Sequence, residues 1–161
     1  MKVLVISDTH THGGSRALPE GAWPYIETAD HILHAGDVVE PRLLDELKSF
    51  APVDVVMGNC DGWDVREWGA TETKVVTVGG VEIGMIHDSG PTTGRRQRMR
   101  KRFPTARVVV FGHSHMPMKE DDGDLLLLNP GSPTWKRRAP YHSMAVLWIE
   151  DGQPLAEVFA V

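Results

Sequence analysis

The sequence predicts one mixed α/β domain, and three observations carry that prediction. Apolar, β-branched runs recur along the chain, helical patterns separate the early runs, and glycine-containing turns separate the later ones. With 161 residues, of which 41% are hydrophobic, the chain can build one substantial core, so we expect a single domain over residues 1–161. The runs expected to form strands are 3–6, 32–33, 53–57, 75–78, 81–86, 108–111, 125–128, 144–149 and 155–161.

Three segments between these strands have the apolar spacing or the end signals of helices, at residues 22–29, 41–50 and 93–102. In the second segment Leu43, Leu44 and Leu47 fall on one face. In the third segment Thr93 suits the N-cap and Pro104 suits a stop. Because strands and helices alternate in the first half, we expect parallel strands joined by crossovers there.

The turn residues of the second half predict hairpins. Gly79-Gly80, Asp122-Gly123 and Asp151-Gly152 each lie between two strand-like runs, and such pairs favour tight turns. We therefore expect several antiparallel strands in this half.

The composition argues against several classes of protein. A net charge of −5 gives the whole molecule no attraction to nucleic acid or anionic membranes. No apolar stretch approaches the roughly 20 residues that span a bilayer. Cys60 is the only cysteine, so an intrachain disulfide cannot form, which fits a reducing compartment. We expect a cytoplasmic protein without a membrane partner.

Metal-competent side chains follow five of the expected strands. They are Asp8 and His10, Asp37, Asn59, His87, and His113 and His115. Loops at the carboxyl ends of parallel strands meet at one edge of a sheet, so the seven side chains are expected to converge. We expect each i, i+2 pair to lie on extended backbone with both side chains pointing the same way. Glycines before Asp37, Asn59 and His113 would allow close approach to an ion.

The number and type of these side chains indicate two metal ions rather than one. Seven ligands exceed what a single catalytic zinc needs, whereas two ions sharing one carboxylate would use them all. Imidazole, carboxylate and amide ligands suit manganese first, with nickel, cobalt, iron or zinc as alternatives. Two carboxylates leave net positive charge at two divalent ions, which favours an anionic phosphate ester as the substrate.

Five short motifs, "SDTH", "HAGD", "GNCD", "MIH" and "GHSH", occur in this order along the chain. Together with "LNPGSP" at 128–133, they resemble the calcineurin-like metallophosphoesterase superfamily, and especially its small bacterial and archaeal phosphodiesterase branch. The resemblance implies a double β-sandwich flanked by helices, in four αββα layers.

The resemblance also implies roles for the seven side chains. Asp8, His10 and His115 would hold the first divalent ion, Asn59, His87 and His113 would hold the second, and Asp37 would bridge both. Hydroxide between the ions would attack phosphorus in line. The residues expected to take part in catalysis are Asp37, Asn59, Asp61 and His113.

Two positions depart from the pattern of the family. Cys60 stands where many larger relatives have a histidine that protonates the leaving group, and a thiol is a poor acid for an alkoxide. Asp61 or a water would serve instead, and Cys60 is expected to be a small packed residue. After His87 the branch often has a glycine and then a second histidine, whereas this chain has Asp88 and Ser89. The expected substrate contacts are Asn59, Asp88 and His142.

Other functions and partners stay open. A phosphomonoesterase, a nucleotide hydrolase or a non-catalytic protein-binding scaffold could use the same fold. The expected partner is a small phosphate ester. Nucleic acid, captured by the basic run at 95–102, is a less favoured alternative to a solvated surface helix. A homo-oligomer formed through hairpin edge strands is a further alternative.

Overall fold

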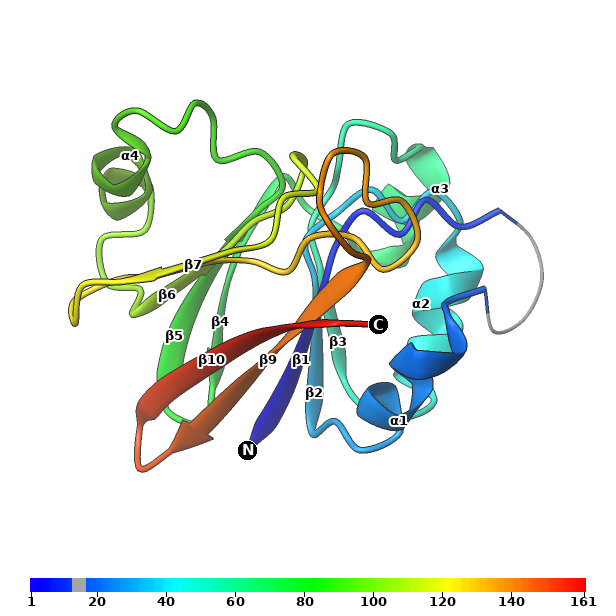
Figure 1. Ribbon diagram of the computed structural model, residues 1–161, viewed down its shortest axis with the longest axis horizontal. Helices are drawn as coiled ribbons and strands as arrows, with labels where there is room; N and C mark the ends of the chain where they lie inside the picture. Colours follow the sequence, from blue (N-terminus) through cyan, green and yellow to red (C-terminus); the bar gives the residue numbers. More distant parts are fainter. Residues whose placement is uncertain (13–16) are drawn as a thin grey trace.

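A computed structural model describes residues 1–12 and 17–161 as two five-stranded sheets with helices on their outer faces (Figure 1). The first sheet has the order β10-β9-β1-β2-β3, with β1 Lys2–Ile6, β2 His31–His34, β3 Val53–Val55, β9 Ser143–Glu150 and β10 Gln153–Ala160. The second has the order β4-β5-β6-β8-β7, with β4 Thr73–Val78, β5 Val81–Ile86, β6 Val108–Val110, β7 Met118–Asp121 and β8 Leu126–Asn129.

The pairing of the strands is mixed, as predicted. Strands β1, β2 and β3 run parallel, and so do β5, β6 and β8. The pairs β4/β5, β7/β8 and β9/β10 are antiparallel hairpins. At two of the predicted turns, Gly80 (φ 79°) and Gly152 (φ 73°) adopt the left-handed conformation that a tight turn needs.

Alternation along the strands divides the core between the layers. Val3 and Val5 pack with Val108 and Leu128 between the two sheets. Leu4 and Ile6 face the other way, into a core with the helices that cover the first sheet. These helices are the 3-10 turn η1 Glu20–Ala22, α1 Trp23–Ile26, α2 Pro41–Lys48 and α3 Trp63–Trp68. A third cluster lies under α4 Arg95–Arg102 on the second sheet, so the expected αββα layers are confirmed.

Two elements were not predicted, and one helix start was wrong. Three of the four residues of β7 are exposed, so this strand shows no apolar alternation. Helix α3 buries only Val65, which leaves no apolar stripe to detect. Helix α4 begins at Arg95 behind Gly94, whose φ of 71° makes a left-handed N-cap, so Thr93 does not cap it.

Helix α4 buries only Met99, so apolar packing gives it little contact with the second sheet. Arginine side chains supply further contacts. Arg96 donates to the Leu125 carbonyl at 2.5 Å, and Arg100 donates to the Ala106 carbonyl at 2.8 Å. The basic run therefore has structural partners, although its sequence has the appearance of a solvated surface. Among the described residues, no helix has the length and hydrophobicity that a membrane crossing would need.

A charged cluster connects the edges of the two sheets. On β3, Asp54 accepts from His31 of β2 at 2.8 Å and lies 2.5 Å from Lys74 of β4. The hydrogen bond from His31 outweighs burial and, with Lys74, lowers the pKa of Asp54 from 3.8 to about 2.

We expect Asp54→Asn to lower the free energy of unfolding by about 1 to 2 kcal/mol at pH 7, because the ionised carboxylate is the favoured form in the folded state. A depressed pKa stabilises the fold above pH 3.8, and this contribution is lost as the pH falls toward 2. The difference between wild type and variant in urea unfolding should therefore shrink below pH 4. The exposed Glu67→Gln should show no such difference, and a constant gap for Asp54→Asn from pH 7 to 3 would contradict the prediction.

Candidate metal centre

The candidate ligands come from both sheets and meet at the carboxyl ends of their parallel strands. Asp8 and His10 follow β1, Asp37 follows β2, and Asn59 lies in the loop after β3. The second sheet contributes His87 after β5, and His113 and His115 after β6. The structure therefore brings together seven side chains that lie as much as 107 positions apart in the sequence.

The loops do not have the extended backbone that the i, i+2 spacing predicted. Five of the seven residues have left-handed backbone, with φ of 55° at Asp8, 41° at His10, 57° at Asp37, 67° at His113 and 58° at His115. Such a conformation costs about 1 to 2 kcal/mol for a residue other than glycine. Hydrogen bonds between loops impose it, for example from Asp8 N–H to the Gly36 carbonyl at 2.9 Å. Strain of this kind clusters at functional sites.

Two of the glycines that precede candidate ligands let neighbouring loops approach each other closely. A Cβ atom at Gly58 would lie 2.1 Å from Asp37 Oδ1. One at Gly112 would lie 1.9 Å from Ser7 Oγ and 2.5 Å from Asp8 Oδ2. No larger side chain fits at either position without displacing a candidate ligand.

The first group of donor atoms consists of Asp8, His10, His115 and Asp37. Asp8 Oδ1 lies 3.2 Å from His115 Nε2, and His10 Nε2 lies 3.4 Å from both His115 Nε2 and Asp37 Oδ2. Two ligands about 2.1 Å from one ion, at angles of roughly 90° to 109°, are about 3.0 to 3.4 Å apart. The spacing of these atoms is therefore that of ligands to a shared cation.

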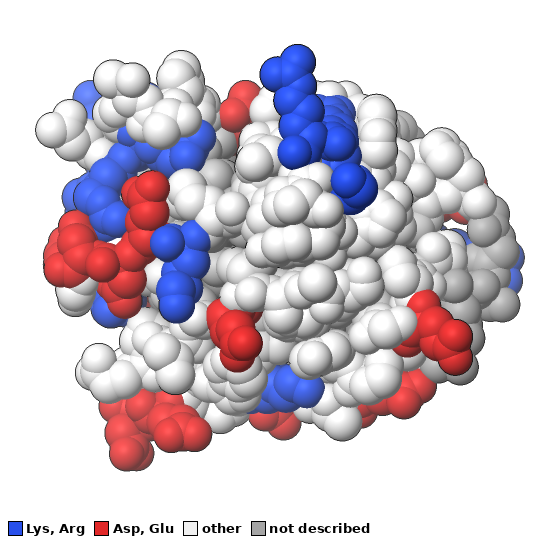
Figure 2. All heavy atoms as spheres, in the orientation of Figure 1, with Lys and Arg blue, Asp and Glu red and all other residues white. Residues whose placement is uncertain are grey.

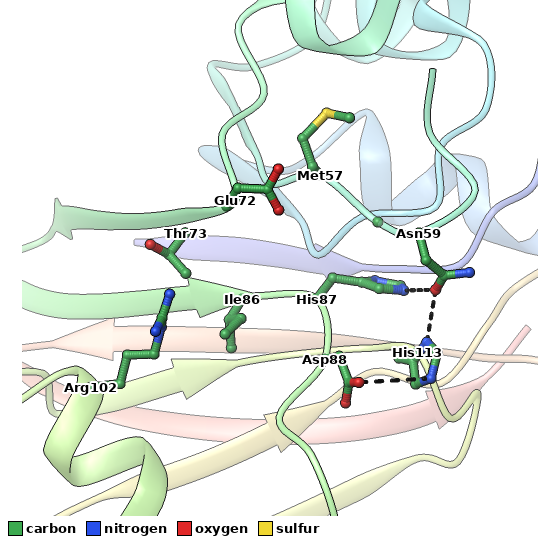
Figure 3. A pocket seen from close by; sticks show the side chains of 10 residues that line it. Met57, Asn59, Glu72, Thr73, Ile86, His87, Asp88, Arg102 and His113 are labelled. Atoms are coloured by element: carbon green, nitrogen blue, oxygen red, sulfur yellow. Dashed lines mark hydrogen bonds and ion pairs between the residues drawn. The ribbon is translucent and has the colours of Figure 1, made fainter. Parts of the chain in front are cut away.

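The second group shares Asp37 with the first. Asn59 Oδ1 lies 3.2 Å from His87 Nε2 and 2.9 Å from His113 Nδ1 (Figure 3). His87 Nε2 lies 3.5 Å from Asp37 Oδ2, the same oxygen that faces His10. One carboxylate oxygen thus faces both groups.

Hydrogen bonds on the far side of two rings set their orientation. His87 Nδ1 donates to the Ala35 carbonyl at 2.7 Å, and His115 Nδ1 donates to the Trp135 carbonyl. In both rings the Nε2 atom consequently faces the centre. This is the arrangement by which proteins orient histidine ligands of metals.

One buried oxygen supports a cation directly. Asp8 is fully buried, and its Oδ2 accepts from Ser7 Oγ at 2.7 Å and from His113 N–H at 3.0 Å. Its Oδ1 has no hydrogen-bond donor in the described part of the chain and instead faces His115 Nε2. Two acceptor atoms in contact repel each other unless a cation lies between them, so these residues fit a divalent metal.

The ionisation of Asp37 and His10 agrees with this, whereas that of His87 does not. Burial raises the pKa of Asp37, but hydrogen bonds from the His87 side chain and the Cys60 N–H outweigh it, so its pKa lies well below the usual range. Burial lowers the pKa of His10 despite the nearby carboxylates, which leaves this ring neutral, as a metal ligand must be. Burial lowers the pKa of His87 too, but its contact with Asp37 and the charge of Asp8 raise it overall.

His34 supports the loops from beneath. Burial lowers its pKa to about 4, so the ring is neutral. Its Nδ1 accepts from Gly36 N–H at 3.2 Å, and its Nε2 donates to Thr9 Oγ1 at 3.0 Å.

Asp61, an expected catalytic residue, forms its hydrogen bonds with backbone groups. Its carboxylate accepts from the N–H groups of Asp37 at 2.9 Å, Val39 at 2.8 Å and Gly58 at 2.7 Å. It therefore holds the loop that presents the shared carboxylate.

Cys60 is exposed on the edge of the centre rather than packed. Its N–H donates to Asp37 Oδ1 at 2.8 Å, and its Sγ lies within 4.8 Å of donor atoms of His10 and Asp37. Partial burial and the Asp37 carboxylate raise the pKa of the thiol, which keeps it protonated.

The other expected substrate contacts lie in different places. Asp88 accepts from Gly90 N–H through Oδ1, and its Oδ2 lies 4.0 Å from His113 Nε2. His142 precedes β9, and its carbonyl accepts from Val161 N–H at 3.1 Å. A cavity of about 300 Å³ adjoins Asn59, His87 and His113, with Asp88 but not His142 in its wall.

The loop after "LNPGSP" contributes residues that the sequence did not reveal as part of the centre. The Trp135 ring lies edge-on to His10 at 5.3 Å between centroids. The guanidinium of Arg137 lies 4.7 Å from the centroid of that ring and donates to the His113 carbonyl at 3.4 Å. The resemblance of this segment to the phosphodiesterase branch was the one signal that could have located them.

The chain is similar to known proteins along most of its length. A sequence model of the calcineurin-like phosphoesterase superfamily domain matches residues 1–152. A probable metallophosphoesterase of Methanothermobacter thermautotrophicus is 36% identical over 159 residues, which cover 96% of this chain and 89% of that protein. A protein of Methanocaldococcus jannaschii named as a phosphodiesterase is 29% identical over 142 residues, covering 81% of this chain and 83% of that protein.

Solved structures of similar proteins have the same fold as this chain. A solution structure of a Thermotoga maritima protein is 31% identical, with a TM-score of 0.75 and 99% of each chain covered. Vps29 of Entamoeba histolytica, crystallised with zinc, is 24% identical with a TM-score of 0.76, covering 99% of this chain and 98% of that one, and this likeness shows the fold alone. Because the family match spans nearly the whole chain, the protein belongs to the calcineurin-like phosphoesterase superfamily.

Proposed function

We propose that the protein is a phosphodiesterase that uses two divalent metal ions, with manganese as the first candidate. The observation that carries this is the Asp37 Oδ2 atom, which lies 3.4 Å from His10 Nε2 and 3.5 Å from His87 Nε2 and so faces both groups of donor atoms. The relative named as a phosphodiesterase supports the reaction class.

Each residue has a proposed task in this reaction. Asp8, His10 and His115 would hold one ion, Asn59, His87 and His113 the other, and Asp37 would serve both. When bound, the ions would polarise the phosphoryl oxygens and lower the pKa of a water molecule. Asp61 would keep the Asp37 loop in position, and Gly58 would leave room for it.

Charge near the centre favours diesters over monoesters. Asp88 lines the cavity 4.0 Å from His113, so it adds negative charge where the substrate would enter. A monoester dianion would be repelled more strongly than a diester monoanion. The Cys60 thiol, with its raised pKa, is a weak acid for an alkoxide, so good leaving groups would be hydrolysed faster.

A non-catalytic scaffold is the alternative from another class, because Vps29 shares the fold and fold alone does not decide function. The presence of all seven ligands at ligand spacing favours the enzyme. A scaffold would bind metal and a protein partner without turnover.

The first test measures metal content and activity together. Protein purified without chelator should contain two divalent ions per chain, and it should hydrolyse bis(4-nitrophenyl) phosphate faster than 4-nitrophenyl phosphate with manganese, nickel or cobalt. Asp37→Asn should lower kcat/KM by at least about 100-fold, because it weakens both groups. The exposed His12→Ala should behave as wild type. Metal-loaded protein without turnover of any ester would support the scaffold instead.

A second test concerns the leaving group. Replacing Cys60 by histidine places an acid of suitable pKa beside the centre, so we expect turnover of esters with poor, alkoxide-like leaving groups to rise at least about 10-fold. Nitrophenyl esters should change little, and Cys60→Ser should not reproduce the gain. Equal rates for Cys60→His and wild type on the alkyl ester would contradict the leaving-group argument.

A third test separates positioning by Asp61 from direct acid catalysis. Asp61→Asn removes one of the two oxygens that accept backbone N–H groups, so metal affinity measured by calorimetry should fall about 10- to 100-fold. The matched control is Asp64→Asn, because the Asp64 side chain accepts only the Val65 N–H among the described contacts. A folded Asp61→Asn protein with unchanged affinity, slowed only on poor leaving groups, would assign Asp61 the role of the acid.

A further inference from the structure

We infer that the cavity beside the second metal group selects substrates that carry a second anionic group, and that Arg102 of α4 binds it. The inference rests on the proposed phosphodiesterase function, which it extends to a class of substrate. Its observations are the lining of one cavity and the pairing of the charges around it.

The cavity has two chemically different ends. Asn59, His87 and His113 lie at one end, and Arg102 lies at the other, across from them in Figure 3. Met57 and Ile86 contribute apolar wall between them. The volume of about 300 Å³ is at the lower end for ligand pockets, which suits one ring-sized substituent between the phosphorus and a second charged group.

Arg102 differs from the other arginines of α4 in having no partner. Within the described residues it makes no hydrogen bond, ion pair or ring contact, and it is exposed. The other four arginines of the helix are held by carbonyl, carboxylate, sulfur or ring groups: Arg95, Arg96, Arg98 and Arg100. Figure 2 shows basic side chains gathered in the region of α4 beside an acidic cluster. Those four arginines cannot turn to a ligand without breaking contacts of the fold, whereas Arg102 can.

The acidic residues of the cavity do not cancel the charge of Arg102. Glu72 lies in the same wall, but it pairs with Arg66 at 2.6 Å, outside the cavity lining. Asp88 lies near His113 at the opposite end and accepts from Gly90 N–H. Neither acidic residue therefore forms an ion pair with Arg102, whose guanidinium stays open to a ligand.

The chemistry of a guanidinium defines the ligand. Its planar, forked donors match the two oxygens of a carboxylate or the oxygens of a phosphate, and such charged hydrogen bonds are stronger than neutral ones. A neutral substituent of the same size would fill the apolar part of the cavity and leave Arg102 in water. Selection for an anionic substituent follows from that difference.

The kinetic test compares phenyl 4-nitrophenyl phosphate with its 4-carboxyphenyl and 4-phosphonophenyl analogues, which share one chromogenic leaving group. Wild type should prefer the anionic analogues by at least about 10-fold in kcat/KM, and the ratio of the two shows whether carboxylate or phosphate is preferred. Arg102→Ala should remove the preference, and Arg102→Lys should keep part of it. Lys101→Ala, the exposed neighbour outside the cavity wall, should keep all of it.

A binding measurement keeps this inference separate from the proposed reaction. Calorimetry would compare phenylphosphonate with 4-carboxyphenylphosphonate on the metal-loaded protein. Tighter binding of the carboxylated ligand that is lost in Arg102→Ala would support the inference even if no ester is hydrolysed, a result that would overturn only the proposed activity. Equal binding of both ligands by wild type, or a preference that survives in Arg102→Ala, would overturn the role of Arg102.

Discussion

The carboxylate of Asp37 is the contact on which the rest of the centre depends. Its Oδ2 faces histidines from both sheets, while its Oδ1 accepts the Cys60 N–H at 2.8 Å. The close approach requires Gly58 to have no side chain and requires Asp61 to hold the backbone of the Asp37 loop. The loops after β1, β3 and β5, which come from both sheets, thus all contact this one buried side chain.

In the protein chain alone, this arrangement lowers the stability of the folded state. Left-handed backbone at five candidate ligands raises the free energy of the folded state, and so does the buried Asp8 Oδ1, which has no hydrogen-bond donor among the residues that the structure describes. The two cores of apolar strand residues on the faces of the first sheet compensate for these costs. A bound cation would add stability selectively to the folded form, because the unfolded chain does not assemble the ligands. Metal binding and folding are therefore expected to be coupled.

The basic helix shows how a surface pattern can mislead. Six cations in eight residues are typical of a polyanion-binding surface, yet Arg96 and Arg100 donate to carbonyls that precede β8 and β6 of the second sheet. Desolvated carbonyls at the ends of strands need donors, and arginine reaches them from a helix that buries only Met99. Arg102, which lines the cavity, has no such partner among the described residues.

The sequence by itself determined the mixed sheets, the hairpin turns and the seven polar positions, because strand periodicity, glycine pairs and strand-end motifs are local signals. It could not reveal β7 or α3, whose few buried residues make no periodic pattern. The left-handed loops, the carboxylate clamp of Asp61 and the exposure of Cys60 were decided by tertiary structure alone. Each depends on hydrogen bonds or contacts between segments distant in the chain, and such contacts leave no trace in local spacing.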